Sequence, residues 1–375
     1  MRFIDIYGQN EIKERLIHSV QTGRMPHALL FHGPQGTGKL ALAIAYAQYI
    51  SCENRGENDS CGQCPSCIQF QKLIHPDLHF TFPVIATQHR VSNGAIKEWR
   101  EFVLKSPYIS YDLWSSFLLQ GGGGATPPII PVTEATEIVS ELNKTPYKSD
   151  FRIQIVCFPE KMNVQCANKL LKIIEEPYPN THFLFVSENS DQILGTILSR
   201  LQSIYVPALP PDVVTEILKK QYPTATEKAI TDTVHIANGN IIKAFDVIEN
   251  GEETQMFLTN FIYIMRTCYT KNILGMKKWS EKVAKWSRKQ QITFLSYAQR
   301  MIRENFIFNI RQKELNYMSS DESGFSEKFS PFINERNICQ FLSELELAER
   351  HIERNGQAKI ILFDLALKIT MLLKM

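Results

Sequence analysis

Residues 33–40 read Gly-Pro-Gln-Gly-Thr-Gly-Lys-Leu and match every position but the last of the phosphate-loop pattern G-x-x-x-x-G-K-[ST]. In this pattern the glycines let backbone N–H groups face a phosphate, and the helix that follows adds partial positive charge. The lysine reaches the terminal phosphates. We therefore expect a phosphate loop in which Gly33, Gly36, Gly38 and Lys39 contact a nucleotide.

The ligands that an ATP site needs for magnesium are missing. The last loop position is Leu40, where a Ser or Thr hydroxyl should ligate Mg²⁺. The strand predicted at 152–158 should end in two carboxylates, but Cys157 and Phe158 stand there. Glu160 is offset by two residues and follows a proline, so it is a poor substitute. We expect no ATP hydrolysis; a purely structural loop and a weak nucleotide site both stay open.

A second group of chemically active residues is the cysteine set Cys52, Cys61, Cys64 and Cys67, with the spacing C-x8-C-x2-C-x2-C. Four thiolates with two C-x2-C steps are typical of tetrahedral zinc, and no position is left for water, so the site should be structural. Disulfides are one alternative, disfavoured in a cytosolic chain. An iron–sulfur cluster is another, but no other redox motif accompanies the cysteines.

The elements that must position these residues alternate between strand and helix, which indicates an α/β domain. Apolar runs bounded by turn residues predict the strands, and longer runs of good helix formers predict the helices. The predicted strands cover 28–32, 152–158 and 182–187, and the predicted helices cover 40–50, 133–142 and 163–174.

The remaining segments differ in character. Residues 86–132 combine six aromatic residues with a Gly-rich, Pro-rich end that includes the run 121–124, so we expect a flexible surface insertion. That insertion has no function of its own or docks its aromatic side chains onto a partner. Residues 253–375 show the helical period, with a polar loop expected at 319–330.

Composition excludes several classes of protein. The chain has 375 residues, and 41 Lys and Arg against 39 Asp and Glu give a net charge of +2, which argues against a basic nucleic-acid coat. No signal peptide is recognisable. The most apolar segment, near 360–373, is interrupted by Asp364 and Lys368, so we expect no membrane span and a cytoplasmic location.

The motifs together resemble the clamp-loader branch of the AAA+ ATPases. The resemblance rests on the phosphate loop after His27–Phe31 (HALLF) and on the four-cysteine insertion that is followed by His75–Asp77 (HPD). Lys161–Pro177 (KMNVQCANKLLKIIEEP) looks like the family's helix after the acidic strand. Ile197–Arg200 (ILSR) is similar to its Ser-Arg-Cys motif, with Leu201 in place of the cysteine.

This resemblance implies a domain plan, an α/β phosphate-loop domain of the AAA+ type followed by two helical domains. The plan is an AAA+ domain at 1–207 that holds a zinc module at 52–67 and the insertion at 86–132, a helical lid domain at 208–252, and an all-helical collar domain for oligomerisation at 253–375.

The resemblance also implies roles. The degenerate ATP site is similar to that of the non-motor, delta-prime branch found in bacterial DNA polymerase III. It implies that Arg200 is an arginine finger for the ATP site of a neighbouring motor subunit; a surface salt bridge is the alternative. Ile242 would replace the lid arginine that touches nucleotide in active members. Implied partners are the gamma/tau motor subunits and the delta subunit, with the sliding β clamp indirectly and primed DNA through the assembly, and no membrane.

Three other functions are weighed against this one. An active clamp-loader ATPase is disfavoured by Leu40, Cys157 and Phe158. A zinc-containing DNA-binding protein is disfavoured because acidic residues offset the basic ones around the cysteines. A small-molecule kinase would leave the long helical C-terminal region unexplained.

Overall fold

The computed structural model describes residues 1–120, 126–310 and 316–374. The chain forms two compact units. The first contains Met1–Gln221 together with Gly239–Lys243, and the second contains Tyr222–Asn238 together with Ala244–Met375.

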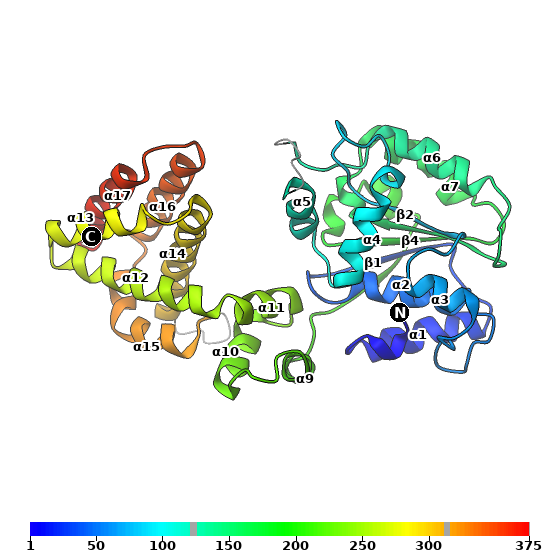
Figure 1. The fold of residues 1–375 in the computed structure, drawn as a ribbon, viewed down its shortest axis with the longest axis horizontal. Helices are drawn as coiled ribbons and strands as arrows, with labels where there is room; N and C mark the ends of the chain where they lie inside the picture. The colour runs from blue at the N-terminus through cyan, green and yellow to red at the C-terminus, as the bar shows by residue number, and fades with distance from the viewer. Residues whose placement is uncertain (121–125, 311–315, 375) are drawn as a thin grey trace. The chain divides into compact units, whose positions relative to one another are not determined.

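The first unit is built on a parallel five-stranded sheet with the order β2-β3-β4-β1-β5 (Figure 1). Neighbouring strands are paired in register, as Ala28 opposite Phe183 and Arg152 opposite Thr181 show. The strands are β1 (Ala28–His32), β2 (Leu78–Thr81), β3 (Arg152–Cys157), β4 (Thr181–Ser187) and β5 (Gln202–Tyr205).

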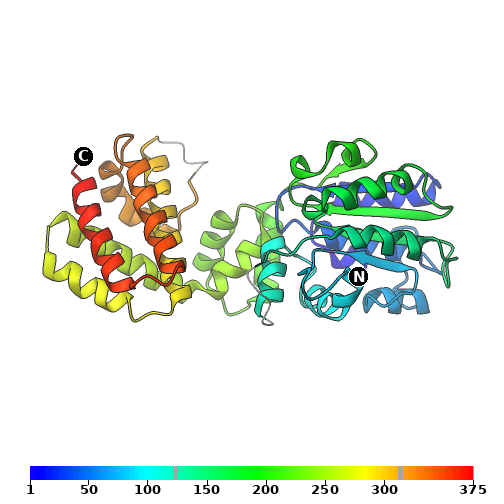
Figure 2. The ribbon, with the colours of Figure 1, turned by 90° about the horizontal axis from the view of Figure 1, so that it is seen from above.

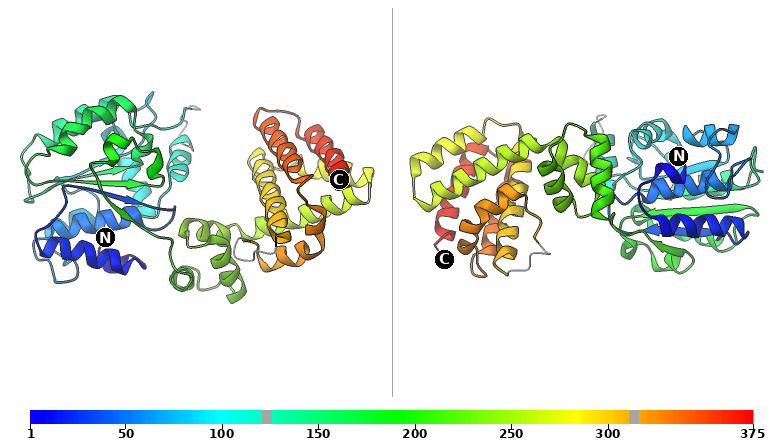
Figure 3. Two further views of the ribbon diagram at one scale, coloured as in Figure 1. Left: turned by 180° about the vertical axis from the view of Figure 1, so that it is seen from behind. Right: turned by 90° about the horizontal axis from the view of Figure 1, so that it is seen from below.

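Alternating side chains of the strands build two hydrophobic cores, one on each face of the sheet. Leu29 and Phe31 of β1 belong to the core shared with α1 and α2, whereas Leu30 belongs to the core shared with α6 and α7. Figures 1 and 3 show these helix pairs on opposite sides of the sheet. The strands are apolar on both faces because helices cover both.

The helices of the first unit follow the strands as expected for an α/β fold, and the predicted fold class is confirmed. Every predicted strand and helix is present to within one or two residues at its ends. The helices are α1 (Asn10–Gln21), α2 (Lys39–Ile50), α3 (Pro65–Gln71), α4 (Ile96–Lys105), α5 (Tyr111–Gln120), α6 (Val132–Leu142), α7 (Val164–Glu175), α8 (Gly195–Leu198) and α9 (Pro211–Gln221).

In the segment 86–132, predicted as a flexible surface insertion, the described helices α4 and α5 contribute side chains to the first core. Trp99 of α4 and Trp114 of α5 are fully buried. Trp99 stacks on Phe82 at 4.3 Å between ring centroids, and Trp114 meets Trp99 edge-on at 5.0 Å. The aromatic residues are thus part of the core, although the neighbouring glycine run had suggested a flexible segment. That run, 121–124, lies outside the described residues.

The second unit contains helices alone in the part of the chain that the structure describes (Figure 2). Its aromatic and aliphatic core draws on six of its helices, from α12 to α17. The helices are α10 (Glu227–Ala237), α11 (Ile241–Glu249), which begins in the first unit, α12 (Gly251–Tyr269), α13 (Ile273–Val283), α14 (Arg288–Asn309), α15 (Ser320–Phe329), α16 (Ile338–Glu353) and α17 (Ala358–Leu372).

The polar loop predicted at 319–330 is instead the helix α15. Ser319 caps it by accepting from the Glu322 backbone N–H, and the Glu322 side chain accepts from the Ser319 backbone N–H. This reciprocal capping box offsets the low helix propensity of a serine-rich segment. Among the described helices, none is both long and apolar enough to span a bilayer.

Candidate functional site

The phosphate loop joins the end of β1 to the start of α2, where the sequence placed it. Gly36 and Gly38 adopt φ angles of 70° and 84°, in the left-handed region that favours glycine. At Gly33 a Cβ atom would lie 2.2 Å from the Val206 carbonyl oxygen, so a side chain is excluded by contact. The loop therefore needs Gly36 and Gly38 for their backbone angles and Gly33 for its close contact with Val206.

Lys39 points back at its own loop. Its Nζ atom donates to the Gly33 carbonyl oxygen at 2.9 Å and also to the Pro34 carbonyl oxygen. Burial lowers the pKa of Lys39 to about 8, although Glu188 and Glu160 act in the opposite direction. The ammonium group that would meet a phosphate is thus desolvated and bonded to backbone.

Two further residues, Tyr108 and Asn240, lie against the loop and were missed in the sequence. A Cβ atom on Gly38 would lie 3.2 Å from the Tyr108 ring, and one on Gly36 would lie 2.1 Å from the Asn240 side-chain oxygen. Burial raises the pKa of Tyr108 to about 12, so its phenol stays neutral at physiological pH. Ile241 donates its backbone N–H to the Gly36 carbonyl at 3.3 Å, and Ile242 next to it is half-buried.

The three positions expected to hold magnesium ligands are apolar and buried. Leu40, Cys157 and Phe158 are each no more than 1% exposed. Phe158 follows β3 with φ 56°, and its ring meets Tyr111 edge-on at 5.9 Å. Burial raises the pKa of the Cys157 thiol well above its usual value, so the group is neutral. None of the three side chains offers an oxygen to a hard cation.

The charges of Glu160 and Glu188 act on the Lys39 ammonium group. Both carboxylates also accept hydrogen bonds from other residues. Glu160 accepts from the Ser187 hydroxyl at 2.8 Å and from the Glu188 backbone at 3.1 Å. Glu188 accepts from the Gln35 side chain at 3.1 Å, and burial raises its pKa. Glu188 follows β4, which pairs with β1, so the order of the strands in the sheet brings it to the loop.

Arg200 lies between α8 and β5, away from the residues of the phosphate loop in sequence. Its Nε atom donates to Glu175 at 3.1 Å and its Nη1 atom donates to the Thr196 carbonyl at 2.8 Å. The side chain is about one-third exposed. The structure thus shows the salt bridge that was the alternative role for Arg200, and the Nη2 group has no bond to another described residue.

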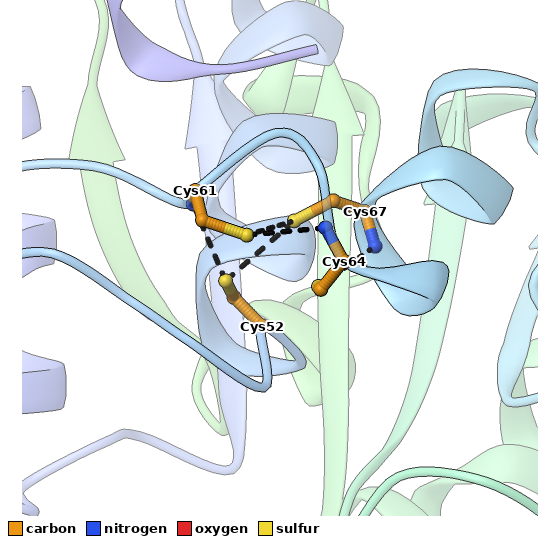
Figure 4. Close-up of side chains that lie close together, drawn as sticks. All are labelled: Cys52, Cys61, Cys64 and Cys67. Carbon is orange, nitrogen blue, oxygen red and sulfur yellow. Dashed lines mark hydrogen bonds between the residues drawn. The ribbon is translucent and has the colours of Figure 1, made fainter.

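The four cysteines meet in one cluster (Figure 4). Their sulfur atoms all lie within 4.8 Å of one another. The Cys61–Cys67 and Cys67–Cys52 sulfur pairs are 3.9 and 3.6 Å apart. A tetrahedron with zinc–sulfur bonds of about 2.3 Å has edges of about 3.8 Å. These two separations are too long for disulfides, which need sulfurs about 2 Å apart, and they are close to the edge of such a tetrahedron.

Local backbone geometry prepares the cluster for thiolates. Cys61 accepts from the backbone N–H groups of Gln63 and Cys64, and these bonds lower its pKa to about 6. Burial raises the pKa values of Cys52 and Cys67, a cost that a bound cation would offset. The residues present therefore fit a four-thiolate metal site that has no open position.

The His75–Asp77 motif fixes the chain ahead of β3. The Asp77 carboxylate accepts from the backbone N–H groups of Tyr147, Lys148 and Ser149 at 2.6, 2.9 and 2.8 Å. Burial lowers the pKa of His75 to about 4, so its imidazole is neutral, and its Nδ1 accepts from the Asp77 N–H at 3.2 Å. This motif therefore holds the loop 147–149 in place through hydrogen bonds to its backbone.

Comparison with protein families gives a match over residues 8–210 to the family described as DNA polymerase III, delta subunit. This range covers more than half of the chain. The chain belongs to that family. The predicted resemblance to the delta-prime branch of the clamp loaders is thereby confirmed.

Individual relatives carry names from the same complex. DNA polymerase III subunit delta' of Bacillus subtilis is 26% identical over 57% of this chain and 52% of its own length. The subunit delta' of Haemophilus influenzae is 26% identical over 67% of this chain and 64% of its own length. DNA polymerase III subunit gamma of Buchnera aphidicola is 24% identical over 66% of this chain and 58% of its length. The chain thus spans between half and two thirds of these relatives.

Among solved structures, a DNA polymerase III gamma subunit-related protein from Thermotoga maritima matches 96% of this chain and 99% of its own at 13% identity. The TM-score is 0.40, too low to add to the family assignment. The sequence match to the delta-subunit family falls within the first unit. The phosphate loop, the cysteine cluster and Arg200 all lie in the matched range.

Proposed function

We propose that this chain is a non-catalytic clamp-loader subunit that takes part in loading the sliding β clamp onto primed DNA. In this role it does not hydrolyse ATP itself but supplies Arg200 to the ATP site of a neighbouring gamma/tau motor subunit. The delta subunit and further motor subunits complete the assembly. The observation that carries the proposal is the loss of every expected magnesium ligand, at Leu40, Cys157 and Phe158.

The first part of the proposal, absence of hydrolysis, follows from charge. Phosphoryl transfer depends on Mg²⁺ and on a positioned water to stabilise the charge that develops on the γ-phosphate. Neither Leu40 nor Phe158 can bind magnesium, and the Lys39 ammonium is bonded to Gly33 and Pro34 carbonyls. Tyr108 and Asn240 contact the glycines that would cradle phosphate.

The second part, the arginine finger, is supported by the position and the open bonding capacity of Arg200. A guanidinium is always charged, and its fork of N–H donors fits phosphate oxygens. Glu175 and the Thr196 carbonyl accept from Nε and Nη1, and Nη2 has no partner among the described residues. An exposed ion pair such as that with Glu175 contributes at most about 1 kcal/mol, so a triphosphate can displace it.

The cysteine cluster is proposed to hold one structural zinc ion. Its sulfur separations and backbone N–H···S bonds fit such an ion, and zinc needs no redox chemistry from the chain. The ion would fix the loop 53–60, whose Asp59 accepts from the backbone N–H groups of Phe3 and Ile4. Zinc would therefore support the N-terminal segment next to α2, without taking part in ATP chemistry.

The helical second unit is proposed as the collar that joins the other subunits. The inner face of α17 packs into the unit's own core through residues such as Leu362 and Leu365. Its outer face is also apolar, since Ile360, Leu367 and Met371 are 61, 39 and 63% exposed. We name these three residues the α17 stripe. An exposed apolar stripe on a folded helix is typical of a protein–protein interface.

The direct test is a measurement of ATP hydrolysis by the purified chain. We expect no magnesium-dependent turnover above background and no change when Lys39 is replaced by Ala. ATP turnover by the isolated chain that Lys39→Ala abolishes would instead make it an active motor subunit. A salt-sensitive, submicromolar affinity for DNA that depends on the cysteine cluster would favour the zinc-containing DNA-binding alternative.

A further inference from the structure

We propose that a groove between α12 and α15 in the second unit binds an amphipathic helix of a partner protein with carboxylates beside its apolar face. The cavity has a volume of about 470 Å³. We call it the α12–α15 groove, and it lies apart from the α17 stripe. The inference goes beyond the proposed clamp-loading role and does not rest on it.

The floor of the groove is a preformed aromatic surface. Phe325 and Phe329 stack with centroids 4.9 Å apart, and Phe329 lies 6.3 Å from Phe332. Tyr269 meets Phe332 edge-on at 5.1 Å while it stays 57% exposed. Rings held by one another lose little entropy when a ligand covers them, so an apolar face gains affinity here at low cost.

The length of the groove suits two turns of a helix. On α12 the lining residues Ile262, Arg266 and Tyr269 are spaced by four and three positions, so they share one face of that helix. From Ile262 to Tyr269 the helix axis rises about 10 Å. Apolar helices commonly dock into grooves of this kind through side chains at the same spacing.

The charges at the groove select the sign of the partner. Arg266 and Lys328 line the groove and are exposed, and neither has an ion pair or a side-chain hydrogen bond among the described residues. The acidic lining residue, Asp321, already pairs with Lys228 at 2.8 Å. Within the described part of the chain, two positive charges are thus left without an ion pair beside an apolar floor, which favours a partner with carboxylates at the border of its apolar face.

Gly324 lines the groove without a side chain. It lies inside α15, where glycine costs about 1 kcal/mol relative to alanine. A Cβ atom at this position would meet nothing within 4 Å, so no packing inside the unit requires glycine. A larger side chain here would enter open space beside the aromatic floor, and it provides a way to block the groove without disturbing the fold.

The test uses the full chain and two fluorescein-labelled helical peptides of 18 residues as probes, about the length of five helical turns. Both carry leucine on one face; one has glutamate and the other has lysine at the remaining positions. Fluorescence anisotropy is measured with the wild type, Gly324→Leu, the double variant Arg266→Glu/Lys328→Glu, and the matched charge control Arg288→Glu/Lys289→Glu on α14. Thermal unfolding confirms that each variant is folded.

We expect saturable binding of the Leu/Glu peptide to the wild type and to the α14 control, and at least tenfold weaker binding to the two groove variants. The Leu/Lys peptide should prefer the Arg266→Glu/Lys328→Glu variant. The proposal is overturned by unchanged binding to Gly324→Leu, by equal binding of both peptides to the wild type, or by no saturable binding. A dimer in sedimentation that Gly324→Leu disrupts would assign the groove to a second copy of this chain and would also overturn it.

Discussion

Lys39 shows at the residue scale how a motif can persist while its chemistry changes. The side chain is buried, bonded to Gly33 and Pro34, and has its pKa lowered to about 8. In an active site the same lysine would hold a triphosphate. Here the carbonyl oxygens of the loop itself accept the lysine's hydrogen bonds, so its position is accounted for without a bound nucleotide.

The lowered pKa of Lys39 gives a pH-dependent prediction. Above pH 8 the folded chain releases this proton while the unfolded chain, with a pKa near 10.4, still binds it. The free energy of unfolding of the wild type should therefore rise relative to Lys39→Met between about pH 8 and pH 10, by up to about 1.4 kcal/mol per pH unit. Urea unfolding at several pH values measures this difference, and parallel profiles for the two proteins would contradict it.

Local spacing made some site residues predictable and left others hidden. The glycines of the loop and the four cysteines lie within short stretches, so their types and spacing predict their meeting. Tyr108, Glu188 and Asn240 reach the loop from three distant segments. Tertiary packing brings them there, and no local pattern in the sequence marks them.

At the element scale, the segment 86–132 is part of the fold through α4 and α5. Replacing Trp99 by Ala should lower the free energy of unfolding by about 3–5 kcal/mol, because a fully buried ring is removed from a stack with Phe82 and Trp114. Tyr147→Ala, at a side chain that is 87% exposed, is the control and should change it by less than about 0.5 kcal/mol. If chemical denaturation showed equally small losses of stability for Trp99→Ala and Tyr147→Ala, the segment would be a surface insertion after all.

The sequence predictions were wrong for two segments whose composition is typical of loops but whose residues pack or cap helices. Four glycines suggested a flexible insertion, but the aromatic residues before them supply core packing. Serines and charges suggested a loop at 319–330, but the capping box at Ser319 and Glu322 starts a helix there. Strands covered on both faces were predictable because their apolar runs are continuous; the short strands β2 and β5 have only four residues each and gave no such signal.

The cysteine cluster gives a second prediction at this scale. Purified protein should contain about one zinc ion per chain, and replacing Cys61 and Cys64 by Ser should remove it. Loss of an ion present at about a thousand times its dissociation constant lowers the free energy of unfolding by about 4 kcal/mol. Cys339→Ser, on the exposed face of α16, is the control and should retain the metal. Iron, or no metal, in elemental analysis of fresh wild-type protein would contradict the zinc assignment.

At the scale of the whole molecule, the chain joins a phosphate loop with apolar residues at the expected magnesium positions to a helical unit with an exposed apolar stripe. Replacing Ile360 and Met371 of the α17 stripe by Glu should leave the unit folded, because neither side chain is part of its core. The same variant should bind the gamma/tau and delta subunits at least tenfold more weakly, since charges would enter an apolar interface. Size-exclusion chromatography with the other subunits measures assembly, and wild-type assembly of the variant would rule out the stripe as the contact.

The central claim concerns Arg200, and the rate of ATP hydrolysis by the reconstituted assembly tests it most directly. Arg200→Ala should lower that rate by at least about tenfold, because a guanidinium that meets the γ-phosphate is removed. Glu175→Gln breaks the same ion pair but keeps the guanidinium, so it is the matched control and should hydrolyse ATP at the wild-type rate. An Arg200→Ala assembly that turns over ATP as fast as the wild type would contradict the account.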